Sequence, residues 1–357
     1  MRILSLIIAF GLYGCDMVQN TGKGQDGEWL IPRGEVRDGG PGKDGIPALE
    51  NPAFINMDNA DYMQNDDLVT LARVGNEVRV YPHRILNWHE IVNDAIGGQN
   101  ITVSFCPLTG SSIGLNRELT INGSKTVTTF GVSGLLYNNN LILYDRATDS
   151  YWSQMRNQCV SGALIGTTPE NVPLLETTFR TARTMYPDAR ILSDNTGIYG
   201  SSQYAIYPYG DYRTNNDFLL FDVKPDDNRL PRKERVLGVV VGDAARAYPF
   251  STFNPDTQIA HDQLGGKELV IIGNQKKNIL VAYERRLGSR AIGRFSAFSD
   301  SSRPYLVMTD SLGNRYDIFG RVAEGPDKGQ ALKPLESYIA YWFAFAAFHP
   351  QTDIFRR

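Results

Sequence analysis

Cys106 and His89 are the residues whose types and spacing are best suited to chemistry in this chain. Cys106 follows the apolar run 101–105 and precedes Pro107, so we expect it at a strand end, where a site can open. A cysteine needs a lowered pKa and some exposure to react, and a nearby histidine can activate it and accept its proton. The pair therefore predicts a nucleophile with its base, or two metal ligands. The alternative is a buried apolar cysteine beside a histidine that fixes a turn.

His261 is the residue that could complete a metal site with this pair. If two halves of the chain pack around a pseudo-twofold axis, His261 approaches Cys106 and His89, and such a set suits copper or zinc. No closely spaced motif such as His-Glu-x-x-His is present, so this hypothesis depends on the fold. The chain has only four histidines, and the other two, His83 and His349, are expected on the surface and in aromatic packing.

A second polar cluster joins Asp145 and Arg146 with the Trp-Ser-Gln run at 152–154. Arg146 and Gln154 are suited to binding an anionic or polar group, and Asp145 can orient Arg146. In an enzyme that uses Cys106, Arg146 would bind the charged group of the substrate. The alternative is a structural ion pair and a turn. No phosphate loop or dinucleotide fingerprint occurs in the sequence.

The segments that must position these residues belong to an internal sequence repeat. A run of six residues recurs 167 positions later: Val69, Val74, Gly75, Arg79, Tyr81 and Pro82 correspond to Val236, Val241, Gly242, Arg246, Tyr248 and Pro249. Both runs alternate and end in Tyr-Pro, which predicts strand ends because proline cannot donate to a sheet ladder. The Trp-His-Glu run 88–90 and the run 105–110 occur in the first copy alone, so we expect function there.

Short β-branched runs between turn signals predict the fold class. It is α+β and mainly β, with two pseudo-symmetric tandem copies of an antiparallel sheet or small barrel and a few short helices in each. The first copy spans 46–193 and the second spans 235–357. Between them, residues 194–234 are rich in tyrosine. They predict an ordered crossing segment packed along the junction of the copies, either functional or a purely structural strap.

The N-terminus resembles a bacterial lipoprotein signal. Residues 1–15 combine Arg2, a short apolar run and the sequence Leu12-Tyr13-Gly14-Cys15, which predicts cleavage and a lipid anchor on Cys15. Ordinary secretion is the alternative. Asp16 slightly favours the inner membrane, with the protein on the periplasmic side of the cell envelope. Residues 16–45 are rich in glycine and aspartate without apolar periodicity, so they predict a flexible tether.

Charge and cysteine content limit the function classes. A net charge of −3 with 21% charged residues gives no electrostatic reason to expect nucleic acid as a partner. With Cys15 lipidated, Cys106 and Cys159 remain, and an oxidising compartment permits a disulfide between them. Whether their Cα atoms come close enough is not determined by the sequence.

Several strings of the chain resemble the bacterial family DUF3179, a domain of unknown function. One is Cys106-Pro107-Leu108-Thr109-Gly110, and the others are residues 46–49, 85–94, 130–138, 144–146, 152–154, 208–212 and 230–238. The resemblance covers 46–357 and implies a secreted or membrane-anchored protein, without an established activity. Some members have a second cysteine at the position of Thr109, and its absence here weakens a dithiol redox interpretation.

Three hypotheses of different classes follow. The first is a membrane-tethered periplasmic protein that binds a metal ion or a small polar ligand near the junction, with Cys106 and His89 at the centre. The second is an enzyme with Cys106 as nucleophile or metal ligand, His89 as base and Arg146 for substrate charge. The third is a structural envelope lipoprotein. The first is slightly preferred over the second.

Overall fold

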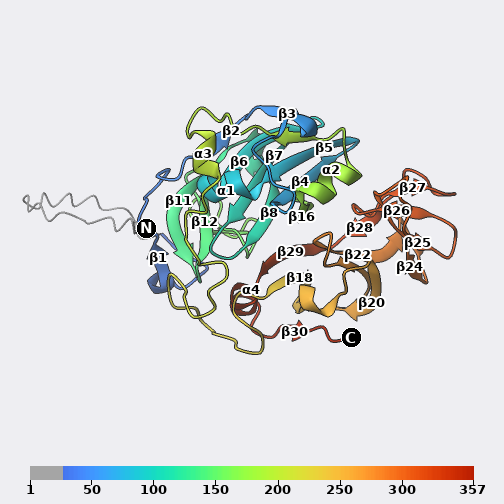
Figure 1. The fold of residues 1–357 in the computed structure, drawn as a ribbon. Coiled ribbons are helices and arrows are strands. Elements are labelled where there is room, and N and C mark those ends of the chain that lie inside the picture. The colour runs from blue at the N-terminus through green and yellow to red at the C-terminus, as the bar shows by residue number, and fades with distance from the viewer. Residues whose placement is uncertain (1–26) are drawn as a thin grey trace, which may run out of the picture.

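The structure is a computed structural model that describes residues 27–357 (Figure 1). The predicted signal 1–15, with Cys15, and the residue Asp16 lie outside the described residues. The described chain is mainly β with a few short helices, as the sequence predicts. In Figure 1 the first part, blue to green, lies above the second part, yellow to red.

Two five-stranded sheets carry most of the first part. The first has the order β16 (Leu174–Thr178), β4 (Leu68–Val74), β5 (Glu77–Pro82), β17 (Arg190–Leu192) and β3 (Phe54–Asn56). The second has the order β15 (Asn171–Val172), β8 (Ser111–Asn116), β7 (Gln99–Cys106), β6 (Ile91–Ile96) and β2 (Leu49–Glu50). Cys106 is the last residue of β7, so the expected strand end is observed.

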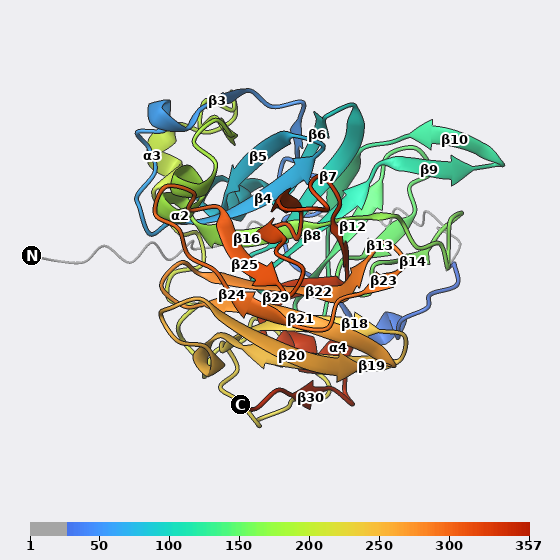
Figure 2. The same cartoon turned by 90° about the vertical axis from the view of Figure 1, so that its right-hand side faces the viewer.

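A third sheet and a separate hairpin complete the first part. The sheet has the order β1 (Val36–Asp38), β11 (Phe130–Tyr137), β12 (Asn140–Asp145), β13 (Tyr151–Ser153) and β14 (Gln158–Ser161). The hairpin pairs β9 (Glu118–Ile121) with β10 (Ser124–Val127) and projects from the body (Figure 2).

The second part contains three sheets. The first has the order β29 (Glu336–Tyr341), β18 (Arg235–Val241), β19 (Ala244–Pro249) and β30 (Asp353–Ile354). The second has the order β20 (Gln258–Leu264), β21 (Lys267–Asn274), β22 (Ile279–Leu287) and β23 (Arg290–Ala291), and β28 (Leu332–Pro334) also pairs with β22. The third has the order β24 (Phe295–Ala297), β25 (Leu306–Asp310), β26 (Arg315–Asp317) and β27 (Val322–Glu324).

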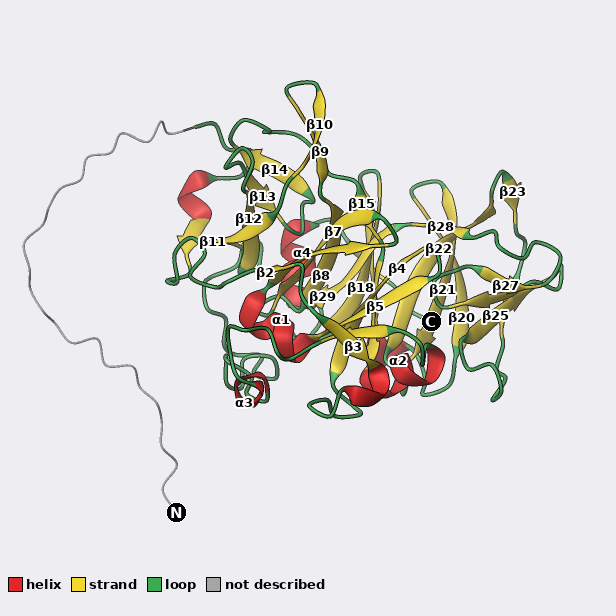
Figure 3. Cartoon of the chain, turned by 90° about the horizontal axis from the view of Figure 1, so that it is seen from above, coloured by secondary structure: helices red, strands yellow, loops and turns green. Residues whose placement is uncertain are grey.

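The helices are short and lie among the strands (Figure 3). They are α1 (His83–His89), α2 (Phe179–Met185), α3 (Ser201–Tyr204) and α4 (Trp342–Phe348), with 3-10 turns η1 (Arg33–Glu35), η2 (Met57–Asn59) and η3 (Phe250–Thr252). Within residues 27–357, no helix has both the length and the apolar character needed to cross a membrane.

The two parts share a strand order around their central hairpins. Val69 lies opposite Pro82 in the β4–β5 pair, and Val236 lies opposite Pro249 in the β18–β19 pair. In each sheet an antiparallel edge strand, β16 or β29, continues into a helix, and a short parallel strand, β17 or β30, pairs with the other side of the hairpin. The first sheet has β3 as an additional strand beyond β17. This order is compatible with the predicted duplication, which stays a prediction. After Pro82 the chain forms α1, whereas after Pro249 it forms only η3.

Residues 27–45 lie against the body of the protein. Strand β1 pairs with β11, and Trp29 bridges to Ser161 beside β14. Ile31 and Val36 are buried in a small cluster with Ile142 and Val160. The flexible tether predicted for 16–45 therefore does not extend over residues 27–45.

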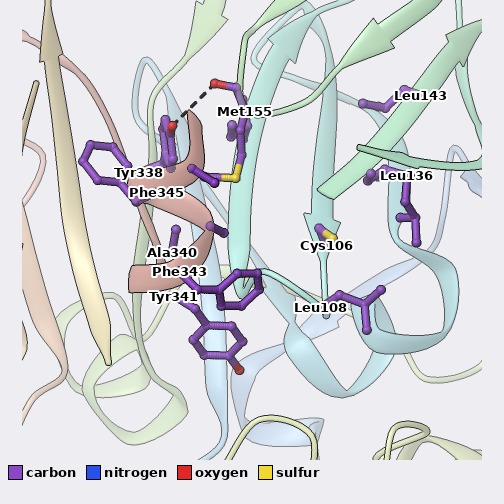
Figure 4. Packing of buried hydrophobic residues seen from close by; sticks show 14 of the residues in the cluster. Cys106, Leu108, Leu136, Leu143, Met155, Tyr338, Ala340, Tyr341, Phe343 and Phe345 are labelled. Carbon is purple, nitrogen blue, oxygen red and sulfur yellow. Dashed lines mark hydrogen bonds between the residues drawn. The ribbon is translucent and has the colours of Figure 1, made fainter. Parts of the chain in front are cut away.

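Each part has a hydrophobic cluster of its own, and two further clusters are shared between the parts. The largest cluster joins Cys106 and Met155 of the first part to α4 and its neighbours Ala340 and Tyr341. Figure 4 shows Tyr341 and Phe343 on the side of α4 nearer Cys106, whereas the ring of Phe345 points away from Cys106, towards β18. The Tyr338 hydroxyl donates to the carbonyl oxygen of Met155 at 3.4 Å, across the same boundary.

Gly238 in β18 provides a test of how α4 packs within the second part. A methyl group on Gly238 would overlap the ring of Phe345 in α4. We expect Gly238→Ala to lower the free energy of unfolding by about 2 kcal/mol, as overpacked cores do. Gly293→Ala is the matched control, because no heavy atom lies within 4 Å of its added methyl group. Urea unfolding of the three proteins measures the effect, and equal stabilities would contradict the packing described.

Candidate functional site

Cys106 is a buried thiol at the end of β7. It is 1% exposed, and its Sγ donates to the carbonyl oxygen of Asn139 at 3.5 Å. Burial, together with the nearby charge of Glu90, raises the pKa of Cys106 to about 11. The residue is therefore a protonated thiol at neutral pH, and this environment does not provide the lowered pKa that a nucleophilic cysteine requires.

The second cysteine of the described chain, Cys159, is also buried, and both cysteines are free. Cys159 donates to the carbonyl oxygen of Ser161 at 3.4 Å, and burial raises its pKa. The disulfide between Cys106 and Cys159 that an oxidising compartment would permit is thus not formed in this structure.

His89 fixes a turn and the crossing segment. Its Nδ1 lies 2.7 Å from the carbonyl oxygen of Pro47, and its Nε2 lies 2.6 Å from the hydroxyl of Tyr204 in α3. Burial lowers the pKa of His89, which keeps the imidazole neutral. A neutral ring that donates from Nδ1 to Pro47 accepts at Nε2 from Tyr204. Both nitrogens are therefore occupied, and His89 has no free position for a base or metal ligand beside Cys106.

His261 lies elsewhere, on an exposed position of β20. Its Nε2 accepts a hydrogen bond from the backbone nitrogen of Phe295 at 2.9 Å, which joins β20 to β24. Within residues 27–357, no group of three or more His, Cys, Asp or Glu side chains could hold a metal ion. The structure therefore does not bring Cys106, His89 and His261 together as the copper or zinc hypothesis expects.

Asp145 and Arg146 serve different structural contacts. Asp145 accepts from Nε1 of Trp152 at 2.9 Å and from the backbone nitrogen of Thr148 at 2.7 Å. Arg146 instead pairs with Asp44 at 2.9 Å and Glu50 at 2.5 Å. These contacts correspond to the structural alternative, with Arg146 fastening residues 44–50 to β12.

Gln154, the other polar candidate of that cluster, is held inside the protein. Its Oε1 accepts from Ser111 at 2.8 Å and from Asn140 at 2.7 Å, and its Nε2 donates to Ser104 at 3.0 Å. The side chain is thereby occupied by a buried network and has no free group for a ligand.

Glu90 is the residue that the structure places beside Cys106. It ends α1 in the left-handed conformation with φ of 55°, and its carbonyl oxygen accepts from the nitrogen of Phe105 at 2.7 Å. Burial raises the pKa of Glu90 to about 8, although the Tyr209 hydroxyl donates to its Oε1 at 3.3 Å. A non-glycine residue held in this conformation is a form of backbone strain found often at functional sites.

Tyrosines of the crossing segment gather around the same place. Burial and the charges of Glu90 and Cys106 raise the pKa of Tyr209. Burial is also the main cause of the raised pKa of Tyr207 and Tyr212, and Cys106 contributes in the same direction. The hydroxyls of Tyr207 and Tyr212 are buried and have no hydrogen-bond partner within the described residues. Because buried polar groups are almost always paired, these two hydroxyls indicate a place where a ligand or water belongs.

Lys233 is a third unpartnered group at this junction. It is 7% exposed, and its Nζ has no hydrogen-bond partner within residues 27–357. The Nζ lies 3.1 Å from the ring centroid of Tyr212, 4.9 Å from that of Phe343 and 5.4 Å from that of Tyr341. We call these three rings the aromatic cage. Burial, with the nearby charge of Arg232, lowers the pKa of Lys233 to about 7.

An open pocket of about 400 Å³ lies where the first part, the crossing segment and the second part meet. We call it the junction pocket, and its wall includes His83, Arg84, Tyr207, Arg213, Arg235 and Tyr341. Two of its arginines are paired, Arg84 with Asp67 at 2.5 Å and Arg235 with Glu176.

His83 contributes a neutral imidazole to this wall. It is 8% exposed rather than on the surface as expected, and its Nε2 lies 3.0 Å from Oγ1 of Thr70. Burial and the charges of Arg235 and Arg213 lower its pKa to about 3.

Sequence analysis missed Glu90, His83, Arg213 and Lys233 as site residues. Glu90 could have been found, because the Trp-His-Glu run occurs in 46–193 and not in 235–357, but a histidine beside it is the more usual catalytic or ligand residue. Lys233 lies in the string 230–238, which resembles the family but has no pattern that indicates chemistry. Nothing in the local pattern of Arg213 distinguishes it from a surface arginine.

Comparison with known proteins identifies a family without a described activity. The sequence model described as "Protein of unknown function (DUF3179)" matches residues 43–352, which is nearly the whole chain. No curated protein and no solved structure matches the chain.

The raised pKa of Glu90 predicts a pH-dependent stability. Between its ordinary value of 4.5 and about 8, the folded protein keeps a proton that the unfolded chain has lost. The free energy of unfolding therefore falls as pH rises through this window, by up to about 1.4 kcal/mol per pH unit. Glu90→Gln removes this contribution, so the variant should lose less stability than the wild type between pH 5 and pH 8, as measured by urea unfolding.

The exposed Glu28 provides the control for this comparison. Glu28→Gln should keep the pH dependence of the wild type. Parallel profiles for the wild type and Glu90→Gln would show that Glu90 does not bind its proton in the way described.

Proposed function

The chain belongs to the DUF3179 family of proteins of unknown function, and we propose that it is a membrane-tethered periplasmic protein that binds a small organic anion in the junction pocket. The ligand is the small polar molecule that the sequence predicts near the junction. Its site is the pocket wall to which the crossing segment contributes, and not Cys106 and His89.

The observation that carries the proposal is the pairing of Tyr207 with Arg213. The guanidinium of Arg213 lies 4.7 Å from the ring centroid of Tyr207, and both residues line the junction pocket. Arg213 is exposed and forms no ion pair with a carboxylate of the described chain, whereas the buried Tyr207 hydroxyl has no hydrogen-bond partner there. A carboxylate or phosphate that accepted from both would give the hydroxyl a partner and replace water on the guanidinium, and arginine is suited to such planar or bidentate recognition.

The paired charges of the pocket favour an anion over a cation. The carboxylates of Asp67 and Glu176 already form ion pairs with Arg84 and Arg235, respectively. His83 is neutral, so it does not add charge but offers a polar ring. Asp66 also lines the pocket and pairs with Arg180 at 3.3 Å, so Arg213 is the charged side chain of the wall that has no charged partner within the described residues.

The enzyme hypothesis based on Cys106 receives no support from this geometry. The thiol is buried and its pKa is raised, and His89 is bound to Pro47 and Tyr204. The envelope location remains supported by the sequence features of residues 1–16.

Arg213→Gln tests the anion site. We expect glycolate, and inorganic phosphate as a separate probe, to raise the melting temperature of the wild type, because a ligand that binds the folded state stabilises it. In Arg213→Gln the affinity should fall at least about tenfold, since a charge-assisted hydrogen bond is lost. Arg356, which is exposed, provides the control variant Arg356→Gln. Equal responses in all three proteins, or none to either probe, would contradict the proposal.

Tyr207→Phe distinguishes binding from a structural role. The lost hydroxyl is buried without a partner, so the ligand-free variant should be more stable than the wild type by about 1 kcal/mol. The same variant should bind glycolate more weakly, because the donor to the anion is gone. Isothermal titration and urea unfolding measure the two effects. A destabilised Tyr207→Phe with unchanged affinity would assign the hydroxyl to the fold instead.

A further inference from the structure

Lys233 is held by its backbone on two sides. Its nitrogen donates to Oδ1 of Asn216 in the crossing segment at 2.8 Å. The adjacent carbonyl oxygens of Arg232 and Glu234 accept from the first residues of α4, Phe343 at 3.1 Å and Trp342 at 2.8 Å. The backbone around Lys233 is therefore fixed by the crossing segment and α4 together.

Burying the amine of Lys233 destabilises the fold. It has no carboxylate partner within the described residues, and its Nζ touches the rings of the aromatic cage instead. Attraction to the ring faces offsets part of the cost of a buried ammonium ion. Burial also shifts the amine towards its neutral form at neutral pH, which is the form that attacks carbonyl carbons. An apolar side chain would fill the same place without this cost.

The aromatic cage and the junction pocket share a wall. Tyr341 lines the pocket, and the centroid of its ring lies 5.4 Å from Nζ of Lys233. Tyr212, against which the amine rests, carries an unpartnered hydroxyl, as does Tyr207 on the pocket wall. Lys233 itself does not line the pocket, so a ligand whose anionic end meets Arg213 and Tyr207 reaches the amine only when the ring of Tyr341 moves aside. The hydroxyls are suited to donating to a carbonyl oxygen.

We propose that Lys233 forms an imine with the carbonyl carbon of a small 2-oxo acid held in the junction pocket. The proposal rests on the proposed anion binding, because the carboxylate of the 2-oxo acid is the anion. The amine nitrogen attacks the carbonyl carbon to give a carbinolamine. Loss of the former carbonyl oxygen as water then gives the carbon–nitrogen double bond. One water is released, and no oxidant or reductant is needed.

Reductive trapping tests the imine directly. The full chain is incubated with glyoxylate and cyanoborohydride near pH 7, and tryptic peptides are examined by mass spectrometry for carboxymethyl groups on lysine. We expect Lys233 to be modified at least about tenfold faster than the exposed Lys276, because an ordinary lysine is almost fully protonated at this pH. Modification of Lys233 no faster than Lys276 would overturn the proposal.

Two controls connect the labelling to the pocket. Arg213→Gln should slow the modification of Lys233 by glyoxylate but not by propanal, which has no carboxylate. Lys276→Arg should leave the labelling of Lys233 unchanged. Equal slowing with both aldehydes would mean that the substitution disturbs the amine itself, and would overturn the assignment of a 2-oxo acid.

Glycolate separates this proposal from the one on which it rests, since it has the carboxylate without the carbonyl. Stabilisation of the wild type by glycolate without labelling of Lys233 would overturn the imine and leave the anion site standing. Labelling of Lys233 without stabilisation by glycolate would overturn the anion site and the 2-oxo acid, and leave a reactive amine. Absence of both would overturn both proposals.

Discussion

Helix α4 is apolar on every side, and this constraint determines how the rest of the structure is arranged. Five of its residues, Trp342 to Ala346, are completely buried, so protein must surround the helix. Strand β18 supplies one wall, where Gly238 leaves room for Phe345. The crossing segment supplies another, where the carbonyl oxygen of Asp227 accepts from the Trp342 indole at 2.9 Å. The enclosure of α4 thus brings Tyr341 and Phe343 to the place where the three parts of the chain meet.

Local patterns were sufficient to predict most of the framework. Each alternating run that ends in Tyr81-Pro82 or Tyr248-Pro249 forms a hairpin of two strands where the sequence predicts one extended run, and the second strand ends at the proline as expected. The position of Cys106 at a strand end also followed from its neighbours in the sequence. These features depend on residues close in the chain, whose side-chain alternation and backbone hydrogen-bonding capacity can be read directly. The absence of a free tether over residues 27–45 could not be read in this way, because the docking of β1 depends on β11, a hundred residues later.

The candidate site was less predictable because its contacts are long-range. His89 is a residue type that can act as a base or metal ligand, yet both of its ring nitrogens are hydrogen-bonded. One partner is a carbonyl oxygen earlier in the chain, and the other is the hydroxyl of a tyrosine 115 residues later. Lys233 resembles a surface lysine in sequence and is buried only because α4 and the crossing segment enclose it. In each case the chemistry of the side chain depends on whether a partner is present, and the partner comes from a distant segment. Residue type and spacing do not contain this information.

The shared core has a consequence for how the chain can be divided. Met155 and Cys106 pack in one cluster with Ala340, Tyr341 and the whole of α4, so separating the halves would expose apolar surface on both. A nick in the crossing segment would produce two fragments that each lack part of their interior. Such fragments are expected to associate and restore the native fold together, in the manner of fragment complementation. The two parts of the chain are therefore expected to fold as one unit through the clusters that they share, and not as independent modules.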